Sequence, residues 1–109
     1  MSIKKFEELT FSTTETPSLY LESRALSGIQ LPDDIAFNSK TMEIQASFDG
    51  KNFAPVYDNE GVKLIISLGA KRFIPLFLND FSSPVYVKFI ASESLDGKTI
   101  TVGYTEIFK

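Results

Sequence analysis

The sequence predicts an all-β fold, a single antiparallel β-sandwich of jelly-roll-like form, and three observations support this expectation. Apolar and polar residues alternate in several short segments, which is the period of a strand with one buried face. Turn-forming residues separate these segments at intervals of roughly 8–12 residues, as in sandwiches and jelly rolls. No segment offers the helix of about a dozen residues that a parallel crossover needs.

In chain order the expected strands are residues 18–23, 27–32, 42–48, 62–68, 85–91 and 98–108. The alternation is clearest in residues 42–48, where one face would hold Met42, Ile44, Ala46 and Phe48. Residues 62–68 are nearly all apolar, as in a strand that is covered on both faces. A turn at Asn38-Ser39 is expected to lead into the strand that contains Met42.

The N-terminal region carries a weaker signal. Residues 3–9 place Ile3, Phe6 and Leu9 at a helical spacing, which predicts a single helical turn. Glu7 and Glu8 interrupt the apolar run that a signal peptide would need, so no targeting segment is expected. Residues 12–18 are polar, and residues 1–18 as a whole are a candidate N-terminal arm.

One domain is expected over residues 1–109, because a chain of this length buries roughly two-thirds of its unfolded surface. Ten Phe and four Tyr supply large side chains for its core. The chain contains no Cys and no His, which excludes thiol and imidazole catalysis and the common zinc sites. We therefore expect a protein that is not an enzyme and has no cofactor and no metal site.

The charge pattern also limits the partners. Eleven basic and fourteen acidic residues give a net charge of −3, and the basic residues are scattered. A nucleic-acid binder needs a positive stripe, and a spanning helix needs roughly 20 apolar residues in a row. Neither feature is visible, so we expect no nucleic acid and no membrane among the partners.

Clusters of Asp, Asn and Gly raise the alternative of calcium. Asp49-Gly50 directly follows an alternating strand, and this pair favours a tight hairpin turn. A second turn is expected at the cluster that ends in Gly61. In a calcium-dependent binding module the metal could be held by Asp33, Asp34, Asp49 or Asp58. Calcium takes six to eight oxygen ligands, and in these two clusters the candidates are Asp49, Asp58, Asn59 and Glu60. Their spacing fits no EF-hand loop, so the turn interpretation is preferred.

In residues 71–81 (KRFIPLFLNDF) two cations precede five apolar residues, and Pro75 interrupts the apolar run. Proline removes a hydrogen-bond donor from a strand, so an edge strand or an irregular loop is expected here. The preferred interpretation places the apolar side chains in the core, with Phe77 or Leu78 as exceptions. The alternative is an exposed docking patch made of Phe73, Ile74, Leu76, Phe77 and Leu78.

The tyrosines offer another hypothesis. Aromatic rings beside polar groups can stack on sugar rings, and the candidates are Tyr20, Tyr57, Tyr86 and Tyr104. A sandwich of this size needs aromatic side chains to fill its centre, so a core role is preferred for them.

Four segments, ALSGIQLPDDI, MEIQASFDGKNFAPVYDNEG, GAKRFIPLFLNDF and VYVKFIASES, resemble small β-rich proteins encoded among the structural genes of tailed bacteriophages. The resemblance covers roughly residues 25–92. The matching positions are Gly28 to Pro32, Ser47, Asp49, Gly50, Phe53, Pro55, Tyr57, Asp58, Pro75, Leu76, Val87, Lys88 and Phe89. The sequence departs from the family pattern at FIASES, and the first 24 residues match nothing in it.

This resemblance implies a β-sandwich structural protein of a virion, assembled in the host cytoplasm. The leading expectation is a capsid decoration or cement protein that stabilises the head by binding between capsid subunits. Its partners would be the major capsid protein or other virion proteins, and it would form a homo-oligomer, with a trimer as one form. The alternatives are a neck or tail accessory protein and a carbohydrate-binding or adhesin-type module.

Overall fold

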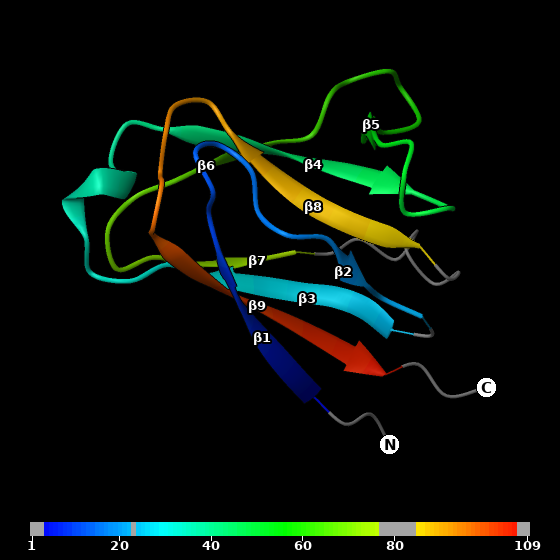
Figure 1. Cartoon of the computed structure of the whole chain (residues 1–109), viewed down its shortest axis with the longest axis horizontal. Helices are drawn as coiled ribbons and strands as arrows, with labels where there is room; N and C mark the ends of the chain where they lie inside the picture. The colour runs from blue at the N-terminus through cyan, green and yellow to red at the C-terminus, as the bar shows by residue number, and fades with distance from the viewer. Residues whose placement is uncertain (1–3, 23, 77–84, 107–109) are drawn as a thin grey trace.

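The computed structural model describes residues 4–22, 24–76 and 85–106. In these residues two antiparallel sheets pack face to face (Figure 1). Sheet A has the order β1-β9-β3-β7, made of Lys4–Thr10, Thr99–Glu106, Arg24–Gln30 and Phe73–Pro75. Sheet B has the order β2-β8-β4, made of Leu19–Tyr20, Tyr86–Ala91 and Thr41–Ser47, and both β5 (Ala54–Pro55) and β6 (Ile65–Ser67) pair with β4.

The strand order is that of a jelly roll. Without the two-residue β5, the sheets read β1-β9-β3-β7 and β2-β8-β4-β6. Most successive strands therefore lie in opposite sheets, and the chain winds around the sandwich as two Greek keys do. The all-β, antiparallel, jelly-roll-like sandwich expected from the sequence is confirmed.

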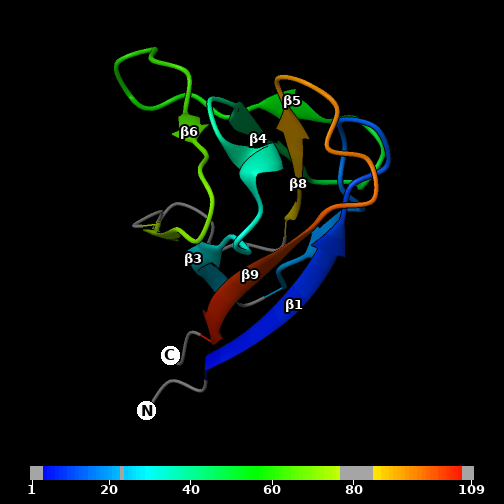
Figure 2. The same cartoon turned by 90° about the vertical axis from the view of Figure 1, so that its left-hand side faces the viewer.

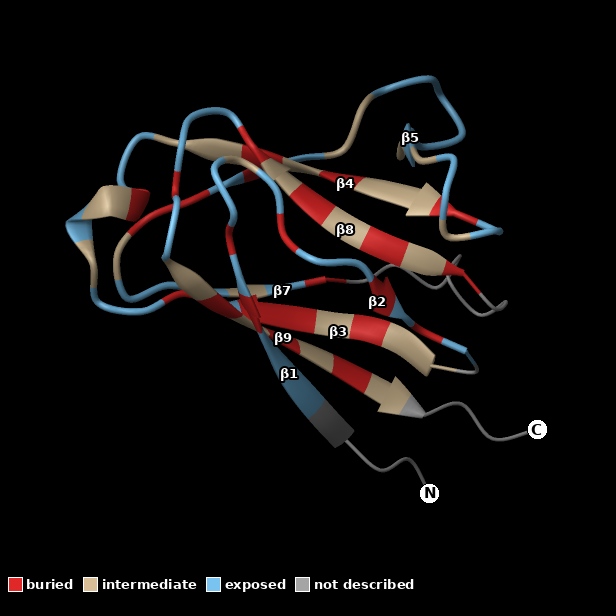
Figure 3. Ribbon diagram, in the orientation of Figure 1, coloured by how far each residue is buried: buried red, intermediate tan, exposed pale blue. Residues whose placement is uncertain are grey.

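The core lies between the two sheets, where the buried bands of the strands face one another (Figure 3). The predicted alternation is confirmed in β9 of sheet A and in β8 of sheet B. In β8 the buried residues are Val87, Phe89 and Ala91, and in β9 they are Ile100, Val102 and Tyr104. Phe11, Phe37 and Phe89 are the largest side chains that are almost completely buried. No helix in the described residues is long and apolar enough to cross a membrane.

The expectation for residues 3–9 is wrong, because residues 4–10 form strand β1 and not a helical turn. β1 pairs with β9 along its whole length, from Lys4 opposite Thr105 to Thr10 opposite Thr99. A full ladder of strand hydrogen bonds outweighs a single helical turn, which is unstable alone. Within the candidate arm, residues 1–18, residues 4–10 therefore lie in sheet A.

Two further expectations need correction. Residues 62–68 do not form a strand covered on both faces, because β6 spans only three residues and Ile65 is 49% exposed. Ile66 is buried, whereas Ile65 and Ser67 on either side of it are exposed, so one face of β6 points to solvent. Phe48 does not share the buried face of β4, since it is 84% exposed. The strand ends at Ser47, whose buried hydroxyl accepts the backbone N–H of Gly50 at 2.9 Å and starts the turn.

Candidate functional site

The outer face of sheet A carries a groove of about 570 Å³. All four strands of the sheet contribute to it. Its lining residues are Phe6, Ser27, Gly28, Gln30, Phe73, Pro75, Thr101 and Gly103. Figure 2 shows β1, β9 and β3 of this sheet side by side, with β1 at the edge.

Cross-strand register explains how these residues meet. Phe6 is paired with Gly103, Gly103 with Gly28, and Gly28 with Pro75. Directly opposed residues on neighbouring strands point to the same face of a sheet. One row across sheet A therefore has an aromatic ring at one end, two glycines in the middle and a proline at the other end. Because the two glycines have no side chains, their backbone forms the floor of the groove.

Phe73 forms the opposite wall. It pairs with Gln30, and its ring lies close to Gly28. A Cβ atom at Gly28 would lie 3.1 Å from Cζ of Phe73 and 3.2 Å from the carbonyl oxygen of Ile74. Glycine thus permits this close approach. Phe6 and Phe73 are 69% and 66% exposed, so two aromatic rings stand on the two edge strands of the sheet, open to solvent.

A polar hollow of about 510 Å³ continues from the groove past Gln30 and Thr101. Its main charged feature is the ion pair between Nζ of Lys98 and Oδ2 of Asp34, at 2.8 Å. Asp34 also accepts the backbone N–H of Ala36 at 2.9 Å, which caps the short 3-10 helix Ile35–Phe37. The hydrogen bond from Lys98, followed by that from Ala36, holds the pKa of Asp34 below its usual value. The Asp34 carboxylate therefore has a structural role, as partner of Lys98 and as cap of the 3-10 helix.

The groove offers contacts for binding. Its two rings can stack on or pack against a partner, and the Gln30 amide and the hydroxyls of Ser27 and Thr101 can form hydrogen bonds. Among its described lining residues there is no carboxylate and no basic side chain. The arrangement is therefore suited to recognition of a surface or a ligand.

The apolar cluster predicted in residues 71–81 is divided between the core and the surface. Leu76 is buried, Ile74 is half-buried against the core, and Phe73 lies on the surface in the groove. A core position for Phe73 is therefore wrong; its strand is the edge of sheet A, and its ring packs over Gly28 on the outer face. Phe77 and Leu78 lie outside the described residues.

Two of the carboxylates considered for calcium, Asp49 and Asp58, accept hydrogen bonds from the backbone of their own turns. Asp49 accepts the backbone N–H groups of Lys51 and Asn52 at 2.8 and 2.9 Å and the Ser47 hydroxyl at 2.7 Å. These donors, the Asn52 and Lys51 backbone first, hold the pKa of Asp49 far below its usual value. Asp58 likewise accepts the N–H groups of Glu60 and Val62. No three carboxylates gather as a cation site in the residues that the structure describes.

The four tyrosines do not form one platform. Tyr20 and Tyr86 are cross-strand partners in sheet B, and their rings stack at 4.6 Å between centroids. Tyr104 is buried, with the guanidinium carbon of Arg24 4.3 Å from its ring centroid. Tyr57 is 55% exposed in the loop before β6. The core role expected for the tyrosines is confirmed for Tyr104 and is wrong for Tyr20 and Tyr57, both of which are exposed.

Sequence reasoning missed Phe6, Gly28 and Gly103 as site residues. A usable signal was present, because a glycine inside a strand often marks close approach of another group. Gly28 and Gly103 both stand inside predicted strands. Phe6, in contrast, was assigned to a helical turn, so its place beside Gly103 could not be foreseen.

The comparisons with known proteins assign no role to the groove, so its role is inferred from the chemistry of its own residues. The likeness of residues 25–92 to phage structural proteins stays a prediction. No family model and no curated protein matches this chain.

Proposed function

We propose that this protein is a non-enzymatic structural protein of a bacteriophage virion, a capsid decoration protein that binds between capsid subunits through the groove of sheet A. The observation that carries the proposal is the pair of exposed rings, Phe6 and Phe73, on either side of a glycine floor. Solvent-exposed apolar groups gathered around a hollow are typical of interaction sites. The absence of Cys and His from the sequence and the family resemblance point in the same direction.

The mechanism is mechanical. The sandwich fills its interior with its own side chains, so its shape is fixed before it docks. An apolar side chain of a capsid subunit would enter the groove between Phe6 and Phe73, and the polar hollow beside Gln30 would face the rim of the contact. A single contact of this size is weak. A homo-oligomer that engages several subunits gains strength from the raised effective concentration of its other copies.

The test is cosedimentation with shells assembled from the major capsid protein of the same phage genome. The wild-type protein is expected to pellet with the shells at micromolar concentration. Phe73→Ala is expected to weaken binding at least about tenfold, as loss of a central aromatic contact commonly does. Phe48→Ala is the matched control, because Phe48 is also highly exposed but lies beyond the end of β4, away from the groove.

If the wild-type protein stays in the supernatant, the decoration role is excluded. Incubation of labelled protein with complete particles, followed by electron microscopy, then separates the remaining virion roles. Label at the neck or tail would assign the protein to an accessory role there.

A carbohydrate-binding role is the second candidate, and one observation favours it. The same groove combines two aromatic rings with the amide of Gln30 and the hydroxyls of Ser27 and Thr101. Sugar rings stack on aromatic faces and need hydrogen-bond partners for their hydroxyl groups. Screening on a glycan array, with and without a chelator, tests this role: saturable binding that Phe73→Ala removes would favour it over capsid docking.

A further inference from the structure

The edge strand β1 carries a charge pattern that is complementary to itself. Residues 4–8 read Lys4-Lys5-Phe6-Glu7-Glu8, with two positive residues before the central Phe6 and two negative residues after it. β1 is an end strand of sheet A in the order β1-β9-β3-β7 (Figure 1). Its second edge pairs with no strand in the described part of the chain.

We propose that two copies of this chain associate through antiparallel pairing of their β1 strands, about a two-fold axis that passes at Phe6. In this register Lys4 lies opposite Glu8 of the second copy, Lys5 lies opposite Glu7, and the two Phe6 residues face each other. In this register each of the four charged residues of one strand is paired with a residue of opposite charge in the other. The two sheets A join into one continuous sheet.

The register is specified by the sequence. A shift of one residue in either direction leaves only two of the four opposite-charge pairs and places a Phe6 opposite a charged residue. Parallel pairing in register would place each charge beside its own copy. Opposite charges directly across a strand pair are stabilising and like charges are destabilising. The antiparallel pair centred on Phe6 is therefore the favoured one.

Charged residues on an edge strand usually prevent edge-to-edge pairing. In β1 these charges would disfavour pairing with an edge strand of another sequence. Pairing of β1 with itself is favoured, because the order of the charges places opposite charges across from each other. The pairing also explains the exposure of Phe6, which is 69% in the single chain. Directly opposed side chains lie within contact distance on one face, so the two rings would cover each other.

The pairing has a consequence for the groove. Phe6 is one wall of it, and the two-fold axis places the second groove on the same face of the joined sheet. The two grooves would lie on the same face of the dimer, one on each side of the paired Phe6 rings. An axis at Phe6 generates a two-fold dimer and no trimer, because residue-to-itself pairing exists only about a two-fold axis. This inference does not depend on the capsid role, since it concerns the isolated chain.

A charge-exchange experiment tests the proposal by sedimentation equilibrium over micromolar to submillimolar concentrations. The wild type is expected to dimerise reversibly. The variant K4E/K5E and the variant E7K/E8K each place like charges opposite one another, so each alone is expected to dimerise at least about tenfold more weakly. An equimolar mixture of the two is expected to form a heterodimer. Salt is expected to weaken the wild-type dimer.

A second measurement locates the axis. The chain has no cysteine, so Phe6→Cys introduces the only thiol. Directly opposed residues of an antiparallel pair have Cα atoms about 4.5–5.5 Å apart, within the range of about 4.4–6.8 Å that a disulfide spans. Mild oxidation is expected to convert Phe6→Cys to a covalent dimer, whereas the exposed control Phe48→Cys stays largely monomeric.

The proposal is overturned if the wild type is monomeric over the whole concentration range, or if both charge variants dimerise as strongly as the wild type. Equal cross-linking of Phe6→Cys and Phe48→Cys would also exclude it. Circular dichroism checks that each variant is folded. Should a charge variant fail to fold, cross-linking of Phe6→Cys, which keeps all four charges, decides the question.

Discussion

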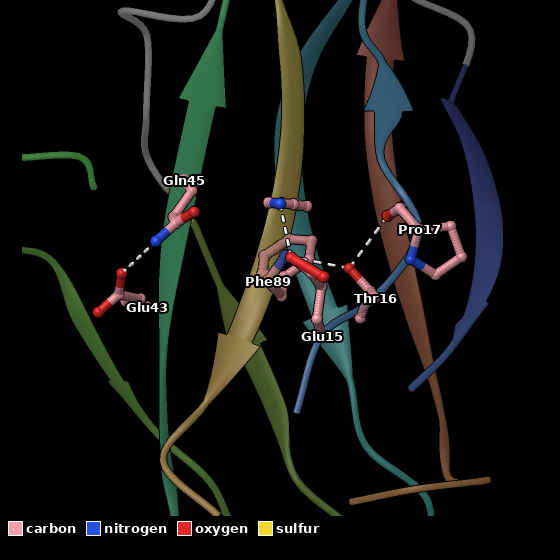
Figure 4. Close-up of polar contacts among 7 residues, drawn as sticks. Glu15, Thr16, Pro17, Glu43, Gln45 and Phe89 are labelled. Atoms are coloured by element: carbon pink, nitrogen blue, oxygen red, sulfur yellow. Dashed lines mark hydrogen bonds and ion pairs between the residues drawn. The ribbon is translucent and has the colours of Figure 1, made fainter. Parts of the chain in front are cut away.

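Thr16 and Phe89 are joined by two hydrogen bonds that tie the connection before β2 to strand β8. Figure 4 shows the bond that the Thr16 hydroxyl accepts. The backbone N–H of Thr16 donates to the carbonyl of Phe89 at 3.0 Å. The backbone N–H of Phe89 donates in turn to Oγ1 of Thr16, also at 3.0 Å. The threonine hydroxyl thus takes the place that a strand carbonyl would hold. It is buried, with 3% of the residue exposed.

Replacement of Thr16 by Val is expected to destabilise the protein by about 1–3 kcal/mol, because the buried N–H of Phe89 would lose its acceptor. Thr16→Ser keeps the hydroxyl and is the control. Urea unfolding monitored by circular dichroism measures both. Equal free energies of unfolding for the two variants would show that the hydroxyl contributes nothing measurable.

The turn after β4 is expected to lose stability in acid. The pKa of Asp49 lies below its ordinary value of 3.8 in the folded protein, because the backbone N–H groups of Asn52 and Lys51 and the Ser47 hydroxyl donate to its carboxylate. A lowered pKa gives stability that is present above the unfolded value and is lost as the pH falls through the folded value. Asp49→Asn should thus be less stable than the wild type at neutral pH, and the difference should shrink below about pH 4.

Thermal unfolding of both proteins from neutral pH to about pH 2 provides the measurement. The difference between them is the useful quantity, because other acids also titrate. Hydrogen bonds from Lys98 and from Lys63 lower the pKa values of Asp34 and Glu43, respectively. A difference that stays constant over the whole range would contradict the role assigned to the Asp49 carboxylate.

The sandwich was predictable because its central strands have two clearly different faces. β4, β8 and β9 each lie between neighbours in a sheet, and one face of each meets the core. Their sequences alternate accordingly. β1 was missed because it lies at an edge, where Glu7 is exposed although its partner Val102 is buried. An edge strand that extends past the core has no apolar face to show in its sequence.

The groove could not be predicted from the sequence, because it depends on register between distant strands. Phe6 and Gly103 are near opposite ends of the chain, and only the β1–β9 ladder places them side by side. The pairing of Gly28 with both Gly103 and Pro75 then aligns the remaining residues of the row. Periodicity reports which face a residue occupies, and it carries no information about which residue lies opposite.

Gly28 and Phe73 are expected to be energetically coupled across the groove. A methyl group at Gly28 would meet Cζ of Phe73 at 3.1 Å, so Gly28→Ala should cost about 1 kcal/mol or more. In a chain that carries Phe73→Ala, the same change should cost less by at least about 0.5 kcal/mol. Some cost should persist, because the carbonyl oxygen of Ile74 would lie at 3.2 Å in both cases. Urea unfolding of the four proteins completes the cycle; additive effects would mean that the ring moves aside freely.

Gly50 and Gly61 allow a final prediction, because their backbones are alike and their surroundings differ. Their φ angles are +77° and +81°, in the left-handed region that side chains disfavour. Replacement by Ala is therefore expected to cost about 1–2 kcal/mol at either site. A Cβ at Gly61 would have no atom within 4 Å, whereas a Cβ at Gly50 would lie 3.2 Å from the ring of Tyr86.

The ring of Tyr86 cannot move away without losing its stacking on Tyr20, whose centroid is 4.6 Å distant. Gly50→Ala should thus be less stable than Gly61→Ala by about 1 kcal/mol, the lower end of the usual cost of overpacking. Urea unfolding of both variants beside the wild type gives the comparison, and the shared backbone strain cancels in the difference. If the two variants are equally destabilised, the Tyr20–Tyr86 stack is mobile enough to accommodate a methyl group and does not fix the position of the turn.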